Sequence, residues 1–387
     1  MKKLFIMMVA ALAVTACSTD DEYDLEYFTQ KYGKTVNPED STIVVPEADT
    51  LYIGIVYNGA TASLTGDIDK VTVSQNGADV TLTSTTDKYL ELTLSGSTSD
   101  GSLLVNSQTA WGLILNGVDI TNQDGPAINN QCGKWLYVTL ADGSTNCLTD
   151  GTAYTEQTFD QKGTFFSEGQ MLFQGAGTLT VNGNAKNGIA SDDYIVIDNG
   201  IININTDDSG SNGIKVNDGL TINGGTLTID VKADGGRGIK CDSLVTINGG
   251  TTTITTSGDC KVETVDGVVD TTSAAGVKCD DLFTMTDGTL TITSKGDGGK
   301  GINCSKDFVF SGGTLTVTTT GSNDVGKPKG IKSDTDIIVS GGSFSVSVKK
   351  SWACDNGTDS ENPDDRVTVL GTPLTKTLLK RSVTIRY

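Results

Sequence analysis

The chain has 387 residues, of which 47 are glycine, 6 are proline and 6% are aromatic, and its formal charge is −20. So acidic a chain repels the phosphate backbone of nucleic acids, and we expect no nucleic-acid partner. It contains no histidine and no pair of cysteines in C-x-x-C spacing, which argues against a zinc site. Cations, or partners bridged by cations, are compatible with this charge.

Residues 1–16 are typical of a lipoprotein signal peptide. Lys2 and Lys3 precede an apolar run over 4–14 that ends in small residues. This pattern indicates an exported protein, and the run is too short for a transmembrane helix. No later segment is long and apolar enough to span a membrane, so the rest of the chain is predicted to be soluble.

The segment VTAC at 14–17 resembles the lipobox of bacterial lipoproteins, whose cysteine becomes the lipidated first residue of the mature chain. Cys17 is therefore the predicted lipid anchor, with ordinary signal cleavage as the alternative. The stretch STDDE at 18–22 resembles the acidic tag of surface lipoproteins of the Bacteroides group, although it would also serve as a solvated tether. We expect an outer-membrane lipoprotein exposed at the cell surface, with a tether and lead-in over 17–45.

A repeat of about 25 residues dominates the middle of the chain. Its marker is a glycine followed by Ile or Val, at Gly188, Gly213, Gly238, Gly276, Gly301 and Gly330. Apolar residues recur one, seven, nine, fourteen and sixteen positions after each glycine, in short runs that follow the two-residue period of a strand. Each unit therefore predicts three short strands, rich in Thr, Val and Ile and separated by Gly/Asn/Asp turns, with no room for a helix.

Such units cannot bury their apolar faces alone, so they must stack. We predict an all-β fold, a right-handed parallel β-helix in which equivalent residues of successive coils lie about 4.8 Å apart. The recurring phrase GGT, as at 224–226, lies between the second and third strands of each unit. Glycine there allows the chain to turn a tight corner.

The repeat predicts a single β-helix domain over 46–387. Residues 46–110 alternate less regularly and are interpreted as irregular first coils, and 111–350 are interpreted as regular coils. Residues 351–387 break the pattern with a basic run and are predicted to cap the open end. Within the regular part, one coil is aligned with Phe166 in the place of the recurring isoleucine.

One inward-facing column, three positions after the glycine, contains small or sulfur-bearing side chains. Its members are Ser191, Val216, Cys241, Cys279, Cys304 and Ser333. Buried free cysteines that pack as small apolar groups are one interpretation, and a disulfide between neighbouring coils is the other. The chain has eight cysteines, which leaves seven after Cys17, so at least one is unpaired within the chain.

Two outward-facing columns are charged. Lysines stand two positions after the glycine, at Lys215, Lys240, Lys278 and Lys332. Aspartates stand four and five positions after it, at Asp192, Asp193, Asp242, Asp280, Asp281 and Asp334. One interpretation is that the two columns neutralise each other. The other is that the aspartates bind calcium, which prefers several oxygen ligands, while the lysines bind the carboxylates of an acidic sugar.

Two unique features interrupt the repeat. An insertion of 13 residues before Gly276 adds Glu263, Asp266 and Asp270, either as a binding loop or as an ordinary surface loop. Arg237 is the only arginine among the regular coils and is a further candidate for carbohydrate binding. The tryptophans do not recur with the coil and are predicted to pack in the core; they are Trp111, Trp135 and Trp352.

Four phrases together resemble a known family. They are LNGVDITNQDGPAI at 115–128, VTLADGSTNCLTDGTAY at 138–154, GTLTVNG at 177–183 and GIKCDSLVTINGGT at 238–251. They resemble the bacterial carbohydrate-binding-domain proteins built on a pectate-lyase-like β-helix. The resemblance implies a right-handed β-helix, bound calcium, and affinity for plant polysaccharides such as cellulose and pectin, without established cleavage.

These observations favour a surface-anchored, monomeric protein that holds a plant cell-wall type polysaccharide, acidic in character, on one face of the β-helix. Calcium is the expected cofactor, and no enzymatic activity is expected. One alternative is a polysaccharide lyase or hydrolase on the same scaffold, for which Arg237 is the candidate base. The other is an adhesive stalk that binds a protein instead of a glycan.

Overall fold

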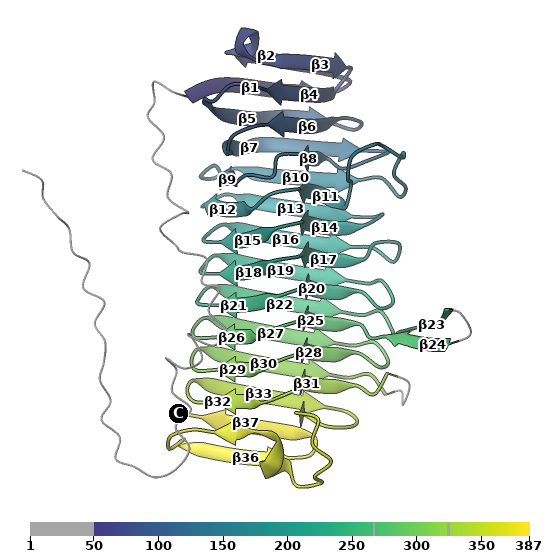
Figure 1. Cartoon of the computed structure of the whole chain (residues 1–387), viewed down its shortest axis with the longest axis vertical. Helices are drawn as coiled ribbons and strands as arrows, with labels where there is room; N and C mark the ends of the chain where they lie inside the picture. The colour runs from purple at the N-terminus through teal and green to yellow at the C-terminus, as the bar shows by residue number, and fades with distance from the viewer. Residues whose placement is uncertain (1–49, 266–267, 323–325) are drawn as a thin grey trace, which may run out of the picture. The chain divides into compact units, whose positions relative to one another are not determined.

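The computed structural model describes residues 50–265, 268–322 and 326–387, and these form an all-β parallel β-helix (Figure 1). The predicted signal peptide and tether, with Cys17, and Asp266 of the insertion lie outside the described residues. Helix in the described part is limited to two short 3-10 turns, η3 (Ile68–Lys70) and η4 (Pro363–Arg366). None of its helices has the length and apolar character that a membrane span requires.

Three ladders of strands make up the solenoid. The first strands of the coils form a sheet of 12 strands, here called the first ladder. It contains β3 (Thr72–Asn76), β4 (Asp79–Ser84), β6 (Ser102–Ser107), β8 (Ile128–Asn130), β11 (Gly163–Ser167), β14 (Asn187–Ser191), β17 (Asn212–Val216), β20 (Arg237–Cys241), β25 (Ala275–Cys279), β28 (Lys300–Cys304), β31 (Lys329–Ser333) and β34 (Cys354–Asp355).

A sheet of 23 strands contains the other two ladders. The second ladder contains β9 (Leu136–Leu140), β12 (Met171–Gly175), β15 (Tyr194–Ile197), β18 (Gly219–Ile222), β21 (Leu244–Ile247), β26 (Phe283–Met285), β29 (Phe308–Phe310), β32 (Ile337–Val339) and β35 (Thr368–Val369). The third contains β10 (Thr145–Asp150), β13 (Thr178–Gly183), β16 (Ile201–Thr206), β19 (Thr226–Val231), β22 (Thr251–Thr256), β27 (Thr289–Ser294), β30 (Thr314–Thr319) and β33 (Ser343–Val348). Each regular coil thus has three short strands, as the repeat predicts.

The two ends of the solenoid depart from the regular coil. At the N-terminal end three strands are longer, β1 (Thr50–Asn58), β5 (Tyr89–Thr98) and β7 (Trp111–Asn122), and β2 (Thr61–Gly66) runs antiparallel to β1. Strand β7 pairs with both β9 and β10, so it joins the second and third ladders into one sheet. At the C-terminal end β36 (Thr375–Leu379) and β37 (Ser382–Arg386) form a hairpin, and β37 runs antiparallel to β33.

Equivalent residues of successive coils are paired in register. Ile214 is the partner of Ile239, Ile239 of Val277, Val277 of Ile302, and Ile302 of Ile331, and all five are buried. The predicted stacking of the inward column is therefore confirmed. It gives the solenoid one continuous apolar core, because each coil covers the apolar edges of the next.

One predicted alignment is wrong by one residue. Phe165, and not Phe166, pairs with Ile189 in the isoleucine column, and Phe166 pairs with Ala190. Both phenylalanines are buried, so the apolar pattern alone does not distinguish the two registers.

The corner between the second and third strands explains the recurring glycines. Gly225 and Gly250 have φ values of +75° and +73°, in the left-handed region that disfavours other residues. A Cβ atom on Gly250 would also lie 2.7 Å from the backbone of Gly224 in the coil before. The corner therefore needs glycine both for its conformation and for the close approach of neighbouring coils.

The cysteine column lies inside the solenoid. Cys241, Cys279 and Cys304 are fully buried and are paired in register, and the cysteines of the described residues are all free thiols. Burial raises the pKa of Cys241 to about 11. These thiols pack as small apolar groups, which agrees with the first interpretation of the column.

The insertion before Gly276 forms a β-hairpin that projects from the body (Figure 1). Its strands are β23 (Lys261–Val265) and β24 (Val268–Thr272), paired antiparallel, with Glu263 opposite Asp270. Both carboxylates are exposed. The hairpin begins next to the loop that precedes β20, which places it beside the candidate site described below.

Candidate functional site

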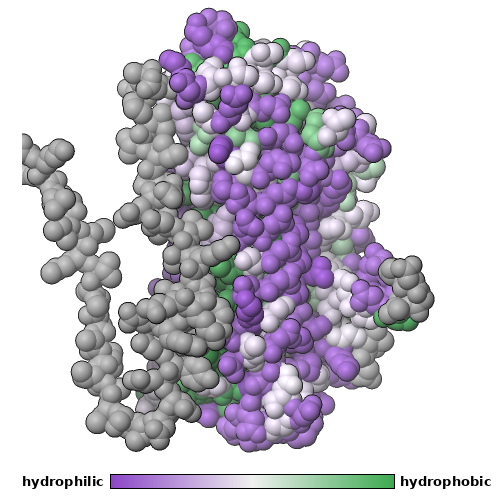
Figure 2. Space-filling model, in the orientation of Figure 1, coloured by the Kyte–Doolittle hydropathy of each residue, from purple (hydrophilic) through white to green (hydrophobic). Residues whose placement is uncertain are grey.

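Lysines and aspartates on the outer face of the first ladder form a continuous chain of ion pairs. Asp242 accepts hydrogen bonds from Lys215 and, at 2.6 Å, from Lys240. Asp280 contacts Lys240 and, at 2.5 Å, Lys278. Burial alone would raise the pKa of either carboxyl, but the adjacent ammonium groups hold both pKa values below the ordinary one. The two predicted columns therefore lie together and neutralise each other. Figure 2 shows that hydrophilic residues form a continuous band that runs from coil to coil down the stack.

The remaining aspartates of these columns also have polar partners. Lys332 contacts Asp334, and Asp281 lies 2.9 Å from Lys306. Asp193 accepts a hydrogen bond from the amide of Gln170. Its pKa is raised, first by burial and then by the neighbouring carboxyl of Asp218. These aspartates are distributed along the ladder and do not converge on one point.

A cluster of three carboxylates lies near the N-terminal side of this column. Oxygen atoms of Asp160, Glu168 and Asp192 lie within 4.8 Å of one another. The amine of Lys162 contacts Asp192 and lies 2.5 Å from Asp160. Burial, and then the charge of Asp192, raises the pKa of Glu168. Asp192 is the only predicted calcium ligand in this cluster, and Lys162 already supplies a positive charge to it.

Asp242 and Asp280 do not suit calcium. Each carboxylate is held by two lysine amines, so a divalent cation would have to displace both before binding. The cluster around Asp192 fits calcium better, because a single amine, that of Lys162, would have to leave it. Carboxylates from two successive turns of the chain would then supply the oxygen ligands.

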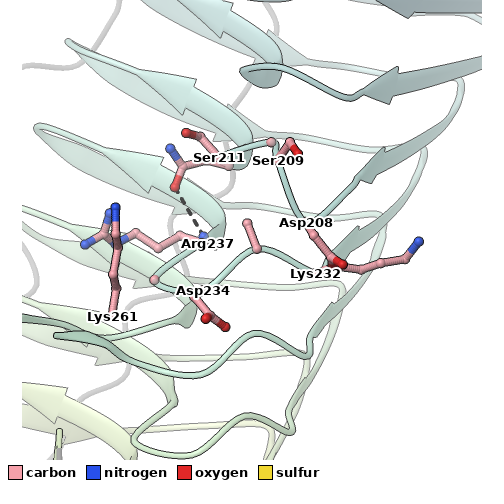
Figure 3. Close-up of a pocket in the computed structure, with 12 residues that line it drawn as sticks. Asp208, Ser209, Ser211, Lys232, Asp234, Arg237 and Lys261 are labelled. Atoms are coloured by element: carbon pink, nitrogen blue, oxygen red, sulfur yellow. Dashed lines mark hydrogen bonds between the residues drawn. The ribbon is translucent and has the colours of Figure 1, made fainter. Parts of the chain in front are cut away.

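Arg237 lines a polar hollow of about 650 Å³ (Figure 3). The loops that precede β17 and β20, together with the first residue of the insertion hairpin, form its walls. The lining residues are Asp208, Ser209, Gly210, Ser211, Asn212, Lys232, Ala233, Asp234, Gly235, Gly236, Arg237 and Lys261. The hollow lies where the insertion interrupts the 25-residue repeat. Its loop DGGRG at 234–238 recurs as DGGKG at 297–301, with lysine in the place of Arg237.

A ladder of side-chain amides fixes the backbone at Arg237. The amide of Asn212 donates at 2.8 Å to the carbonyl oxygen of the Asn187 side chain. The backbone N–H of Arg237 donates in turn to the side-chain oxygen of Asn212 at 3.2 Å. Arg237 is the next residue in this column. Its side chain is longer and extends beyond the local hydrogen bonds that Asn187 and Asn212 make. The position of its backbone is therefore set by the stack of coils.

Arg237 is a half-buried cation without an ion-pair partner among residues 50–265, 268–322 and 326–387. Burial lowers its pKa, and the more distant charges of Asp280 and Asp242 partly offset this effect. The other two cations of the hollow are paired, Lys232 with Asp207 at 3.4 Å and Lys261 with Glu263 at 2.6 Å. Figure 3 shows Arg237 and Lys261 on one side of the hollow and Lys232 directed away from it.

Lys300 stands further along the same column, and sequence reasoning did not single it out. Its amine donates to the hydroxyl of Ser273 and, at 3.2 Å, to the carbonyl oxygen of Gly326. Burial, and then the charges of Lys332 and Lys329, lowers its pKa from 10.5 to about 8. A lysine amine that loses its proton near pH 8 is able to act as a base.

This pKa predicts a pH-dependent difference in stability. Because the pKa of Lys300 is lower in the folded than in the unfolded chain, the folded state is penalised at neutral pH. The penalty disappears as pH rises from about 8 towards 10.5. The thermal midpoint of the parent protein should therefore rise relative to that of Lys300→Met between pH 7 and pH 10. If the difference between the two thermal midpoints were constant across this range, the lowered pKa of Lys300 in the folded protein would be contradicted.

The three tryptophans have different environments. Trp111 is fully buried and its indole N–H donates to Asn130 at 3.0 Å. Trp352 is nearly buried beneath the cations of Arg366 and Lys380. Trp135 is half-buried outside the apolar core, so the expectation of core packing is wrong for this residue.

Most of the solenoid matches a known protein family. Residues 71–363, about three quarters of the chain, match the family described as "Carbohydrate-binding domain-containing protein". A protein of that description from Acetivibrio thermocellus is 32% identical over 143 residues, which are 36% of this chain and 48% of that protein. The match thus spans about half the length of the curated relative.

A solved structure described as a polysaccharide lyase-like protein from C. thermocellum, in a gadolinium derivative, has the same architecture. It superposes with a TM-score of 0.53 and is 25% identical, and the match covers 67% of this chain and 97% of that chain. The β-helix, its repeat and the family match over most of the solenoid agree with one another. The chain belongs to the family of carbohydrate-binding domain-containing proteins.

Proposed function

We propose that this protein holds an acidic polysaccharide of the plant cell-wall type on the side of the β-helix around Arg237, without cleaving it. The observation that carries the proposal is the half-buried guanidinium of Arg237, which has no ion-pair partner within the described residues and lines a polar hollow of about 650 Å³. A guanidinium binds a carboxylate through two parallel hydrogen bonds, which suits the uronic acid units of such a polymer. Membership of a carbohydrate-binding family supports a sugar as the ligand.

The surroundings of Arg237 suit a sugar in other respects. Ser209 and Ser211 offer hydroxyls that both donate and accept hydrogen bonds, and the carboxylates of Asp208 and Asp234 can accept from sugar hydroxyls. A polymer that leaves the hollow along the first ladder would meet the paired lysines and aspartates of successive coils. These pairs offer polar contacts at regular intervals, while Arg237 supplies the unbalanced positive charge.

Arg237→Ala is expected to weaken binding of a uronic acid oligosaccharide by about tenfold or more, because charge-assisted hydrogen bonds to the carboxylate are lost. Affinity would be measured by isothermal titration calorimetry at two salt concentrations. Arg381→Ala is the matched control, since Arg381 is exposed in the C-terminal hairpin turn, remote in sequence from the hollow. Equal affinity of Arg237→Ala and the parent protein would remove Arg237 from the site.

Calcium dependence is a separate proposal. Asp160, Glu168 and Asp192 are the residues proposed to hold the ion, with the amine of Lys162 displaced. Retention of the protein on immobilised pectate, measured with and without a chelator, tests whether the ion contributes. Asp192→Asn should then mimic the chelator, and identical retention in all conditions would dismiss a role for calcium.

Export and anchoring are also proposed here. Cys17 is proposed as the lipidated residue of an outer-membrane lipoprotein at the cell surface, with the β-helix held outside the cell. Labelling cells with a fatty-acid probe should mark the parent protein and leave Cys17→Ala unmarked. Accessibility of the marked protein to an added protease would then distinguish surface exposure from an inward-facing anchor.

The alternative function is cleavage of the polymer by β-elimination. The specific observation in its favour is Lys300, an amine with a pKa of about 8 in the same column as Arg237. Incubation with pectate, followed by ultraviolet absorbance of the unsaturated product, tests it. The binding function predicts no absorbance change. An absorbance signal that disappears in Lys300→Met would establish a lyase. A protein that shows no saturable binding of any glycan would instead favour the adhesive stalk.

A further inference from the structure

Three aromatic side chains gather on the outer surface near the N-terminal end of the second ladder. The rings of Trp135 and Tyr137 are stacked, with centroids 6.0 Å apart and planes inclined by 24°. Leu136 and Val138 on either side of Tyr137 belong to the apolar core, so Tyr137 points to the opposite, outer face of the strand. The cluster is thus separate from the core of the solenoid.

Tyr89 completes the cluster across a glycine. Gly112 is the cross-strand partner of Tyr137, and a Cβ atom on Gly112 would lie 2.7 Å from the hydroxyl oxygen of Tyr89. The ring of Tyr89 therefore lies over the bare backbone of Gly112. Burial, then the neighbouring charges of Glu91 and Tyr137, raises the pKa of Tyr89, so the phenol stays neutral at physiological pH.

In this aromatic cluster of Tyr89, Trp135 and Tyr137, Tyr137 is buried, and Trp135 offers the larger of the two half-buried rings. It is half-buried, and its indole N–H has no hydrogen-bond partner among the parts of the chain that the structure describes. An indole of this kind offers a flat apolar face together with a polar edge. Sugar rings have matching chemistry, since one face carries C–H groups and the rim carries hydroxyls.

We propose that this aromatic cluster is a second glycan-binding site, which stacks the C–H face of a neutral sugar ring on Trp135. The proposal rests on the proposed polysaccharide-binding function. It differs from the site at Arg237 in place and in chemistry. Tyr89 lies on β5, Tyr137 lies on β9 and Trp135 directly precedes β9, and the cluster recognises an apolar ring face. The two sites together would hold a polymer that carries both acidic and neutral sugars, or two different polymers.

The tryptophan environments make the proposal measurable by intrinsic fluorescence. Trp111 is sealed in the core and Trp352 is covered by Arg366 and Lys380, so Trp135 should dominate any response to ligand. Titration with a neutral β-linked glucose oligosaccharide should give a saturable change in emission. Trp352→Phe should retain this change, whereas Trp135→Phe should lose most of it.

Affinity is then compared by calorimetry in four proteins: the parent, Trp135→Ala, Tyr137→Phe and Arg237→Ala. Trp135→Ala should weaken binding of the neutral oligosaccharide by about tenfold, whereas Tyr137→Phe should retain it because the stacked ring remains. Arg237→Ala should leave neutral binding unchanged and weaken the uronic acid oligosaccharide. Circular dichroism melts would confirm that each variant is folded.

The outcomes separate the two proposals. Binding of the uronic acid oligosaccharide without binding of the neutral one would overturn the aromatic site and leave the proposed function standing. Equal affinity of Trp135→Ala and the parent protein for the neutral oligosaccharide would also overturn it. Neutral binding without acidic binding would support the aromatic cluster and contradict the role of Arg237. Absence of binding to either would overturn both.

Discussion

Replacing Phe308 with alanine is expected to lower the free energy of unfolding by about 3–5 kcal/mol. Phe308 is fully buried and its ring is stacked on Phe283 in the preceding coil, with centroids 5.0 Å apart and planes inclined by 5°. The ring of Phe308 also packs at an angle of 65° against that of Phe344, with centroids 6.1 Å apart. Removal of the ring leaves a cavity between coils that the flanking strands cannot close, since their hydrogen-bond register is fixed.

Urea unfolding monitored by circular dichroism would measure this loss. Thr314→Ala is the control, because Thr314 lies in the same coil with an exposed side chain and its truncation should change stability by less than about 0.5 kcal/mol. A loss of less than about 1 kcal/mol for Phe308→Ala would show that this part of the core is not close-packed.

Asp355→Ala should destabilise the C-terminal end by a similar amount, about 3–5 kcal/mol, because it leaves two buried cations unpaired. Asp355 contacts Lys329, which is 9% exposed, and accepts from Arg366, which is 4% exposed, at 2.5 Å. Arg366 also donates to the carbonyl oxygens of Thr358 and Ser360, so it cannot easily swing out to water. The exposed Asp359, changed to alanine, is the control.

The same residue predicts an acid-sensitive cap. Burial alone would raise the pKa of Asp355, but the hydrogen bond from Lys329 and the charge of Arg366 hold it below the ordinary 3.8. The ion pair therefore stabilises the fold above the ordinary carboxyl pKa, and this contribution is lost as pH falls through the lower folded-state pKa. The stability difference between the parent protein and Asp355→Ala should shrink below pH 4. A difference that is independent of pH would contradict an ionised Asp355.

The solenoid itself could be predicted from the sequence because its signals repeat. The inward apolar positions recur in every coil, so a single period fixes which residues face the core and which stack on one another. Ile214 and Ile239 are paired as predicted. The error at Phe165 has a physical reason, since two adjacent phenylalanines are both buried and pattern alone does not say which one occupies the column.

The pairing of the charged columns could be predicted only in part. The sequence places the lysines beside the aspartates. It does not show that Asp242 contacts Lys215 of the preceding coil as well as Lys240 of its own coil. The partner of each lysine depends on its rotamer, which directs the amine either to an aspartate of the same coil or to one of the next coil. It decides whether the carboxylates are available to a cation, which is why the calcium ligands could not be assigned from the columns.

Unique residues gave the weakest signal. Trp135 occurs once, so no periodicity shows whether its ring lies inside or outside. Tyr89 lies 46 positions earlier in the chain, and only the stacking of β5, β7 and β9 brings it near the stacked pair. The hollow at Arg237 likewise requires two loops and a hairpin to come together. The clue available in the sequence was that Arg237 and the insertion both break the repeat.

Hydrogen–deuterium exchange with and without a uronic acid oligosaccharide tests the central claim most directly, because it locates the bound polymer without changing a residue. Binding at Arg237 predicts slower exchange in peptides that cover the loops before β17 and β20 and the start of the insertion hairpin. The third ladder, whose outer face there is rich in threonine, should exchange at the same rate in both samples. Protection confined to that threonine face, with the loops around Arg237 unaffected, would contradict the account.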